Sequence, residues 1–68
     1  MSQAFYGKTV YELIEDCLKR GRVDSVEFRG FISRVPICTM DRWDAVDEYG
    51  SETVLSHTRK RGHLTIWI

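Results

Sequence analysis

An amphipathic segment at residues 10–20 constrains the fold more than any other feature of this chain. Its apolar side chains recur at positions i, i+3, i+4, i+7 and i+8, which form one face of a helix: Val10, Leu13, Ile14, Cys17 and Leu18. Thr9 and Glu12 fit a capping box at its start, and Gly21 is suited to a left-handed residue at its end. We therefore predict a helix over residues 10–20 whose single apolar stripe packs on the rest of the molecule.

The segments that follow have strand patterns. Residues 25–35 alternate, with Val26, Phe28 and Ile32 on one side, although Gly30 interrupts the pattern as a β-bulge does. Pro36 ends this strand or places it at a sheet edge. Residues 52–58 and 63–68 are short and rich in β-branched and aromatic side chains, so both are predicted strands.

Residues 41–49 fit two patterns. Met40, Trp43 and Val46 are spaced three apart, as in a helix, but Asp, Trp, Val and Tyr are mediocre helix formers. A strand places Trp43, Ala45 and Tyr49 on one face, and the following Gly50-Ser51 fits a type II′ turn. We interpret residues 41–49 as a strand, with a helix as the alternative.

These elements predict an α+β fold in a single small domain spanning residues 1–68. One N-terminal helix packs on a small, mostly antiparallel β-meander of about four strands. A three-residue turn, Lys60-Arg61-Gly62, joins the last two strands. The two predicted turns, at Gly50-Ser51 and at residues 60–62, fix the pairing of the strands. This pairing places the following residues on the core face: Trp43, Ala45, Tyr49, Val54, Leu64, Ile66 and Ile68. The expected open face is Asp44, Val46, Leu55, His57, Arg59, His63, Thr65 and Trp67.

The open face is the first candidate functional surface, because one helix covers only one side of a small sheet. We predict that its apolar cluster, Val46, Leu55 and Trp67, binds a protein partner or a second copy of the chain. The cluster is bordered by Arg59 and Asp44, and the candidate partner-binding residues are Val46, Leu55, Trp67, His57 and Asp44. Alternatively, Ala4, Phe5 and Tyr6 fold over Trp67 and bury it.

The second candidate is the basic stretch "SHTRKRGH" at residues 56–63. Arg59, Lys60 and Arg61 at a hairpin tip, with His63 beside them, are placed to contact nucleic-acid phosphates. The ten cations and ten carboxylates of the chain give no net charge, and residues 41–52 are acidic, which argues against strong binding. The alternative is a solvated turn.

Metal binding and catalysis receive little support. Twenty residues separate Cys17 from Cys38, so the tight ligand pairs of structural zinc sites are missing, and Cys17 lies in the apolar stripe. An Asp44–His57 pair across the expected sheet fits a general base or an ordinary surface ion pair. The five glycines do not form a phosphate-binding motif. We expect no catalytic residues, metal or cofactor.

The sequence has neither a signal peptide pattern nor an apolar run long enough to span a membrane. Two cysteines are few for a small secreted domain, so we expect a reduced, cytoplasmic protein. Its predicted function is that of a small non-catalytic binding module, an adaptor or inhibitor acting through protein–protein contact. Nucleic-acid binding through the hairpin at residues 57–63 is the alternative, and a small enzyme or metal-binding domain is the next.

Overall fold

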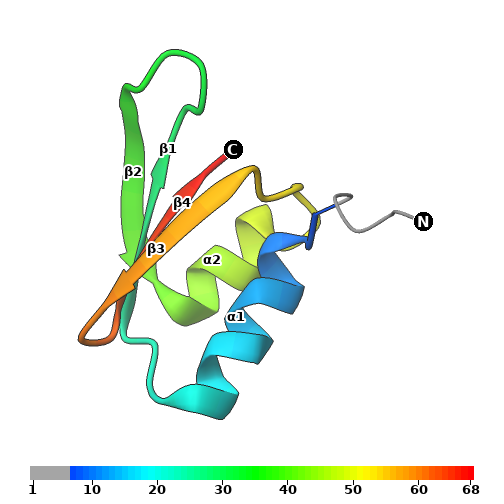
Figure 1. Ribbon diagram of the computed structural model, residues 1–68, viewed down its shortest axis with the longest axis vertical. Helices are drawn as coiled ribbons and strands as arrows, with labels where there is room; N and C mark the ends of the chain where they lie inside the picture. The colour runs from blue at the N-terminus through cyan, green and yellow to red at the C-terminus, as the bar shows by residue number, and fades with distance from the viewer. Residues whose placement is uncertain (1–6) are drawn as a thin grey trace.

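The computed structural model describes residues 7–68, which form two helices and a four-stranded sheet (Figure 1). The elements are α1 (Val10–Arg20), β1 (Ser25–Arg29), β2 (Pro36–Asp41), α2 (Arg42–Tyr49), β3 (Ser56–Lys60) and β4 (His63–Trp67). The predicted α+β class is confirmed. The sheet order is β2-β1-β4-β3, with β1 parallel to β4 and the other two pairs antiparallel, so the sheet is not the expected meander.

Helix α1 has the bounds that the sequence predicts, and its capping box is confirmed. The Glu12 N–H donates to Thr9 Oγ1 at 3.2 Å, and the Thr9 N–H donates to Glu12 Oε1 at 3.1 Å. Gly21 ends the helix with φ 171°, which is extended, so the expected left-handed conformation is wrong. The Gly21 N–H still donates to the Cys17 carbonyl at 3.1 Å, as a helix-ending amide should.

The prediction of a strand over residues 41–49 is wrong, because this segment is helix α2. Asp41 caps it: the Asp44 N–H donates to Asp41 Oδ1 at 2.8 Å. Ala45 is fully buried, whereas Trp43, expected in the core, is 71% exposed. Gly50 follows α2 in a right-handed conformation and donates to the Val46 carbonyl, so the expected hairpin turn at Gly50-Ser51 does not form.

The first predicted strand is shorter than expected. Strand β1 ends at Arg29, residues 30–35 form a turn, and Pro36 begins the unpredicted strand β2. The β1–β2 register shifts between Phe28 and Arg29, next to the Gly30 where a bulge was expected. Ile32 therefore does not share the buried face of Phe28 and is 92% exposed instead.

The β3–β4 hairpin forms, but its turn has two residues rather than three. Lys60 pairs with His63, and both Arg61 and Gly62 have positive φ, at 50° and 82°, as a type I′ turn requires. The pairing consequently slips by one residue from the expected register, and every side chain of β3 changes face. His57 and Arg59 lie on the helix side of the sheet, not on the open face.

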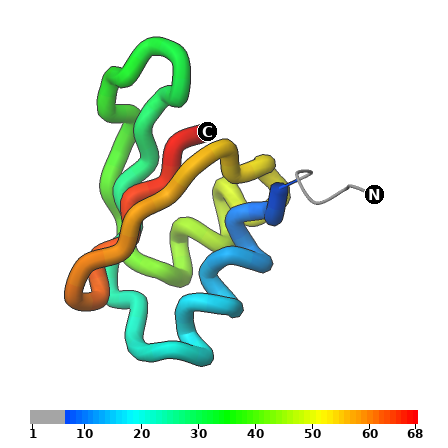
Figure 2. Tube along the Cα trace, in the orientation of Figure 1, coloured from blue at the N-terminus to red at the C-terminus, as the bar shows by residue number. Residues whose placement is uncertain are grey.

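Both helices cover the same face of the sheet, and no element of residues 7–68 covers the other face, which we call the open face (Figure 2). The core combines apolar side chains from both helices and the two central strands with Val23 and Val54: Val10, Leu13, Ile14, Cys17, Val23, Val26, Phe28, Ala45, Val54, Leu64 and Ile66. Neither helix in residues 7–68 is long and apolar enough to cross a membrane. Cover of the open face by residues 4–6 lies outside the described residues.

Candidate binding surfaces

The structure does not bring the five predicted partner-binding residues onto one surface. Trp67 lies on the open face of the sheet, since it alternates with the buried Leu64 and Ile66. Val46 and Asp44 lie on α2, where Val46 packs against the core and Asp44 is exposed. Two predicted residues come from the β3 side of the molecule: Leu55, which is exposed, and His57 on the helix side. The expected cross-strand pair of Asp44 and His57 is also wrong, because Asp44 lies on helix α2 and not on a strand.

An exposed apolar surface lies elsewhere, on the turn between β1 and β2 and at the start of β2. We call this surface the apolar hairpin; it consists of Phe31, Ile32, Val35 and Ile37, all exposed. The Phe31 N–H donates to the Ile68 carbonyl at 3.0 Å, which places the turn beside the end of β4. A shallow pocket of about 170 Å³ lies at this junction, lined by Phe31, Arg34, Ser56, Thr58 and Trp67. Trp67 therefore borders the apolar hairpin. Its carbonyl accepts a hydrogen bond from the Leu55 N–H at 2.9 Å, but the Leu55 side chain lines the pocket between α1 and β3, and Val46 lies on α2.

Sequence reasoning missed the apolar hairpin because residues 25–35 were treated as one strand. A signal was present, since apolar residues after Gly30 break the alternation and continue on both sides of Pro36. Adjacent Phe31 and Ile32 cannot both face the core of a strand whose side chains alternate between two faces. Such a run after a glycine is typical of a turn with exposed apolar side chains.

A chain of polar side chains crosses the middle of the open face. Ser25 Oγ lies 2.7 Å from His63 Nδ1, and His63 Nε2 lies 3.3 Å from Glu27 Oε1. Arg29 Nη1 donates to Glu27 Oε2 at 2.6 Å. The Arg29 hydrogen bond, followed by that of His63, holds the pKa of Glu27 below its usual range. The ring of His63, a candidate nucleic-acid contact from the sequence, is engaged in these hydrogen bonds.

This polar chain has the order of a nucleophile, a base and a carboxylate, but its charges are already matched. Arg29 pairs with Glu27, so the carboxylate is held as an anion whose charge is balanced by a guanidinium. A carboxylate that orients a catalytic histidine must stabilise the imidazolium that forms during the reaction. We interpret the chain as a set of contacts that fixes the Ser25, Glu27 and His63 side chains on the sheet.

The end of α1 and the turn of the β3–β4 hairpin lie toward the same end of the molecule (Figure 1), and both segments carry exposed cations. We call this group the basic end; it consists of Lys19, Arg20, Arg22, Arg59, Lys60 and Arg61, all exposed. The Gly62 carbonyl accepts hydrogen bonds from the N–H groups of Asp24 at 2.7 Å and Ser25 at 3.3 Å. These bonds fasten the hairpin turn to the segment that follows α1, so two sequence clusters about forty residues apart become one surface.

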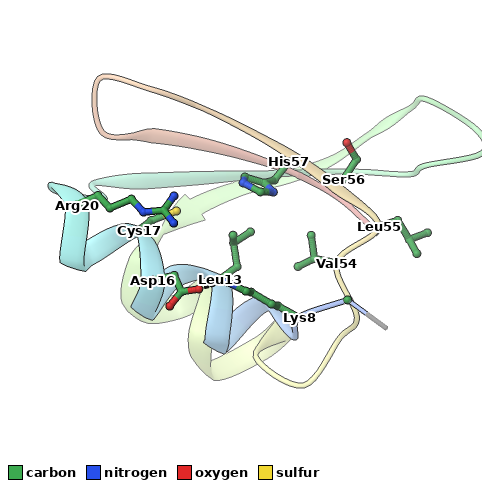
Figure 3. A pocket seen from close by; sticks show the side chains of 10 residues that line it. Lys8, Leu13, Asp16, Cys17, Arg20, Val54, Leu55, Ser56 and His57 are labelled. Atoms are coloured by element: carbon green, nitrogen blue, oxygen red, sulfur yellow. Dashed lines mark ion pairs between the residues drawn. The ribbon is translucent and has the colours of Figure 1, made fainter. Parts of the chain in front are cut away.

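A pocket of about 290 Å³ opens between α1 and β3 (Figure 3). Lys8, Arg20 and His57 line it together, and Lys8 forms an ion pair with Asp16. Burial lowers the pKa of His57, and the positive charges of Lys8 and Arg20 lower it further. The Cys17 thiol at the wall of the pocket is 2% exposed, so its predicted role in the core is confirmed.

Both cysteines are free thiols. Cys38 Sγ lies 3.7 Å from the Tyr49 hydroxyl, a contact that raises the pKa of Tyr49. Within residues 7–68, no three His, Cys, Asp or Glu side chains are grouped so that they could hold a metal ion. Comparisons with known protein families, with curated proteins and with solved structures find no match to this chain.

Proposed function

We propose that this protein is a small non-catalytic binding module, an adaptor or inhibitor that contacts a protein partner through the apolar hairpin and Trp67. The observation that carries the proposal is the exposure of Ile32, at 92%, beside three other exposed apolar side chains of the same turn and the start of β2. Exposed apolar clusters on small proteins mark interaction sites, because each apolar group left in water forgoes the free energy of burial. Arg34 and Trp67, in the pocket beside them, are residue types that dominate binding energy at interfaces.

The difference between the two sheet edges supports a partner that also contacts β2. The β3 edge carries Arg59 and Lys60, and charged side chains discourage another strand from pairing there. The β2 edge carries Ile37 and Met40 and continues directly from the apolar hairpin. An extended segment of a partner can therefore pair its backbone with β2 while its side chains bury the hairpin.

A reducing, cytoplasmic location is part of this proposal. The free thiols of Cys17 and Cys38 support it, since disulfides are rare in cytosolic proteins. The pairing of Glu27 with Arg29 supports a non-catalytic role, because it leaves the polar chain of the open face charge-balanced at rest.

A photo-crosslinking residue at position 32, compared with one at position 55, tests the proposal. Both side chains are exposed and apolar, but Leu55 lies outside the apolar hairpin. In lysate of cells that make the protein, position 32 should give a specific protein adduct that position 55 does not. The captured protein is then purified and its affinity measured directly.

The matched variants Ile32→Asp and Leu55→Asp decide whether the apolar hairpin contributes the free energy of partner binding. Ile32→Asp should weaken binding to the purified partner by about 2 kcal/mol or more, roughly a 30-fold change in Kd. Leu55→Asp introduces the same charge and should leave Kd within about twofold. Equal losses for both variants, with unchanged melting temperatures, would contradict the proposed surface.

A further inference from the structure

We propose that the basic end binds the sugar–phosphate backbone of nucleic acid, independently of nucleotide sequence. This surface lies away from the apolar hairpin, so the inference does not depend on the proposed protein partner. It also differs from a hairpin tip that contacts phosphates alone, because the end of α1 and the segment after it supply half of the cations: Lys19, Arg20 and Arg22.

The basic end concentrates positive charge that the whole-chain total conceals. Its six cations are accompanied in residues 19–24 and 59–62 by one carboxylate, Asp24, which leaves a local formal charge of +5. The chain is neutral overall, so the remaining residues carry a formal charge of −5. Asp24 pairs with Arg22 at 2.7 Å, and Asp41, on the nearby β2, is held in the cap of α2. A surface of this kind attracts polyanions and repels a second copy of itself.

Two kinds of contact bring the β3–β4 turn and the end of α1 together. The hydrogen bonds from Asp24 and Ser25 to the Gly62 carbonyl fix the turn against the end of α1. The guanidinium of Arg59 lies directly against Gly21, in the space that a Cβ there would occupy. Placing like charges side by side is unfavourable unless an anion offsets the repulsion. The dipole of α1 accounts for Lys19 and Arg20, but not for the position of Arg59 against Gly21, the residue that follows them.

The chemistry of the surface fits phosphates better than an acidic protein. Four of its six side chains are arginine, whose planar guanidinium pairs with phosphate oxygens through two parallel hydrogen bonds. None of the six is apolar, whereas protein interfaces have an apolar centre. The hairpin itself is a two-stranded ribbon that turns sharply at Arg61-Gly62, a shape that fits between phosphate backbones.

Fluorescence anisotropy with labelled duplex DNA and single-stranded RNA tests this proposal on the full chain. Wild-type affinity should fall steeply between about 50 and 200 mM salt, with a slope near 0.9 per phosphate contact. Two double variants remove cations from the two sides: Lys60→Ala with Arg61→Asn, and Lys19→Gln with Arg20→Gln. Asn at position 61 tolerates the positive φ of the turn. Each double variant should lower the salt slope by about 2, which is about a 60-fold loss of affinity at 0.1 M salt.

Arg34→Asn is the matched control for Arg61→Asn. Both arginines have positive φ, at 62° and 50°, but Arg34 lies in the turn that follows β1. The control should retain wild-type affinity and salt slope, and circular dichroism should give similar melting curves for all variants. A loss of affinity confined to the Lys60/Arg61 variant would show that the cations at the end of α1 do not take part in binding. No binding by the wild type at about 50 mM salt would overturn the proposal entirely. Polyglutamate that competes as well as nucleic acid would assign the surface to acidic proteins instead.

Discussion

The contact between Phe28 and Tyr49 allows the position of α2 to be measured in solution. Phe28 is fully buried in β1, and its ring centroid lies 4.4 Å from that of Tyr49, with the rings inclined at 31°. The two rings are tilted and in close contact, and aromatic pairs contribute about 0.5–1.5 kcal/mol beyond burial. The pair exists because α2 lies against the sheet with Tyr49 on its last turn. We predict a coupling free energy in that range between Phe28→Leu and Tyr49→Leu.

The assay is urea unfolding followed by circular dichroism for wild type, both single variants and the double variant. A domain of 68 residues has a free energy of unfolding of about 3–10 kcal/mol. Leu is chosen over Ala at position 28 because truncation of a buried Phe to Ala costs about 3–5 kcal/mol and leaves too little stability to measure. Tyr49→Phe keeps the ring and removes the hydroxyl that contacts Cys38, so it should preserve the coupling.

The reasoning fails if the two Leu substitutions are additive. Distant residues that share no contact add within about 0.3–0.5 kcal/mol. A coupling below that limit would mean that the rings do not meet in solution and that α2 does not pack on β1 as described. The same cycle can be repeated with the Tyr49→Phe protein as its starting point. If the coupling disappears there, it belongs to the Tyr49 hydroxyl and not to the aromatic rings.

Three further predictions follow from burial and charge. Cys17→Ala should lower the free energy of unfolding by about 1 kcal/mol in a urea titration, since it leaves a small cavity beneath α1. Burial and nearby cations hold the pKa of His57 below its usual value, so unfolded chains bind this proton more readily. The contribution of His57 to the free energy of unfolding should be full above a pH of about 6.5 and fall as pH drops through the folded pKa. His57→Gln should flatten this decline, and an NMR titration of the wild type should give the lowered pKa of His57 directly. In sedimentation equilibrium the protein should dimerise at micromolar concentration through the Trp67 face, and Ile32→Asp should favour the monomer; an 8 kDa species alone up to about 100 μM would contradict this.

Helix α1 could be predicted from the sequence because its signals are local and agree with one another. The apolar stripe, the Thr9–Glu12 capping box and the ordering of charges all lie within about a dozen residues. The position of the last hairpin is local in the same way, since Gly62 marks a turn between two short β-branched segments. The openness of one sheet face also followed from the sequence, because small sheets rarely cover both faces.

Helix α2 was harder because its own residues barely favour a helix. Eight residues are too few for a stable isolated helix, so packing must supply the stability. That packing is nonlocal: Ala45 is buried in the core and Tyr49 meets Phe28 from a distant strand. The spacing of Met40, Trp43 and Val46 was a local signal for this helix, and it was outweighed by the mediocre helix propensities of the residues.

The two surfaces could not be located from the sequence for topological reasons. The two-residue turn at Arg61-Gly62, where three residues were expected, moves His57 and Arg59 to the helix side. The parallel pairing of β1 with β4 joins segments separated by β2, α2 and β3, which no local pattern indicates. Only this pairing places the hairpin turn against the segment after α1, and so forms the basic end.

The arrangement of the two surfaces predicts that they act independently. The apolar hairpin and the basic end lie towards opposite ends of the longest axis of the molecule, which measures 33 Å (Figure 1). Effects of substitutions more than about 10 Å apart, with no shared contacts, usually add. Ile32→Asp should therefore leave nucleic-acid affinity and its salt slope unchanged, and Lys19→Gln with Arg20→Gln should leave partner affinity unchanged. Anisotropy of labelled nucleic acid with saturating partner should then report a ternary complex with the same affinity. Competition between the two ligands would place them on one surface and contradict the assignment of separate ends.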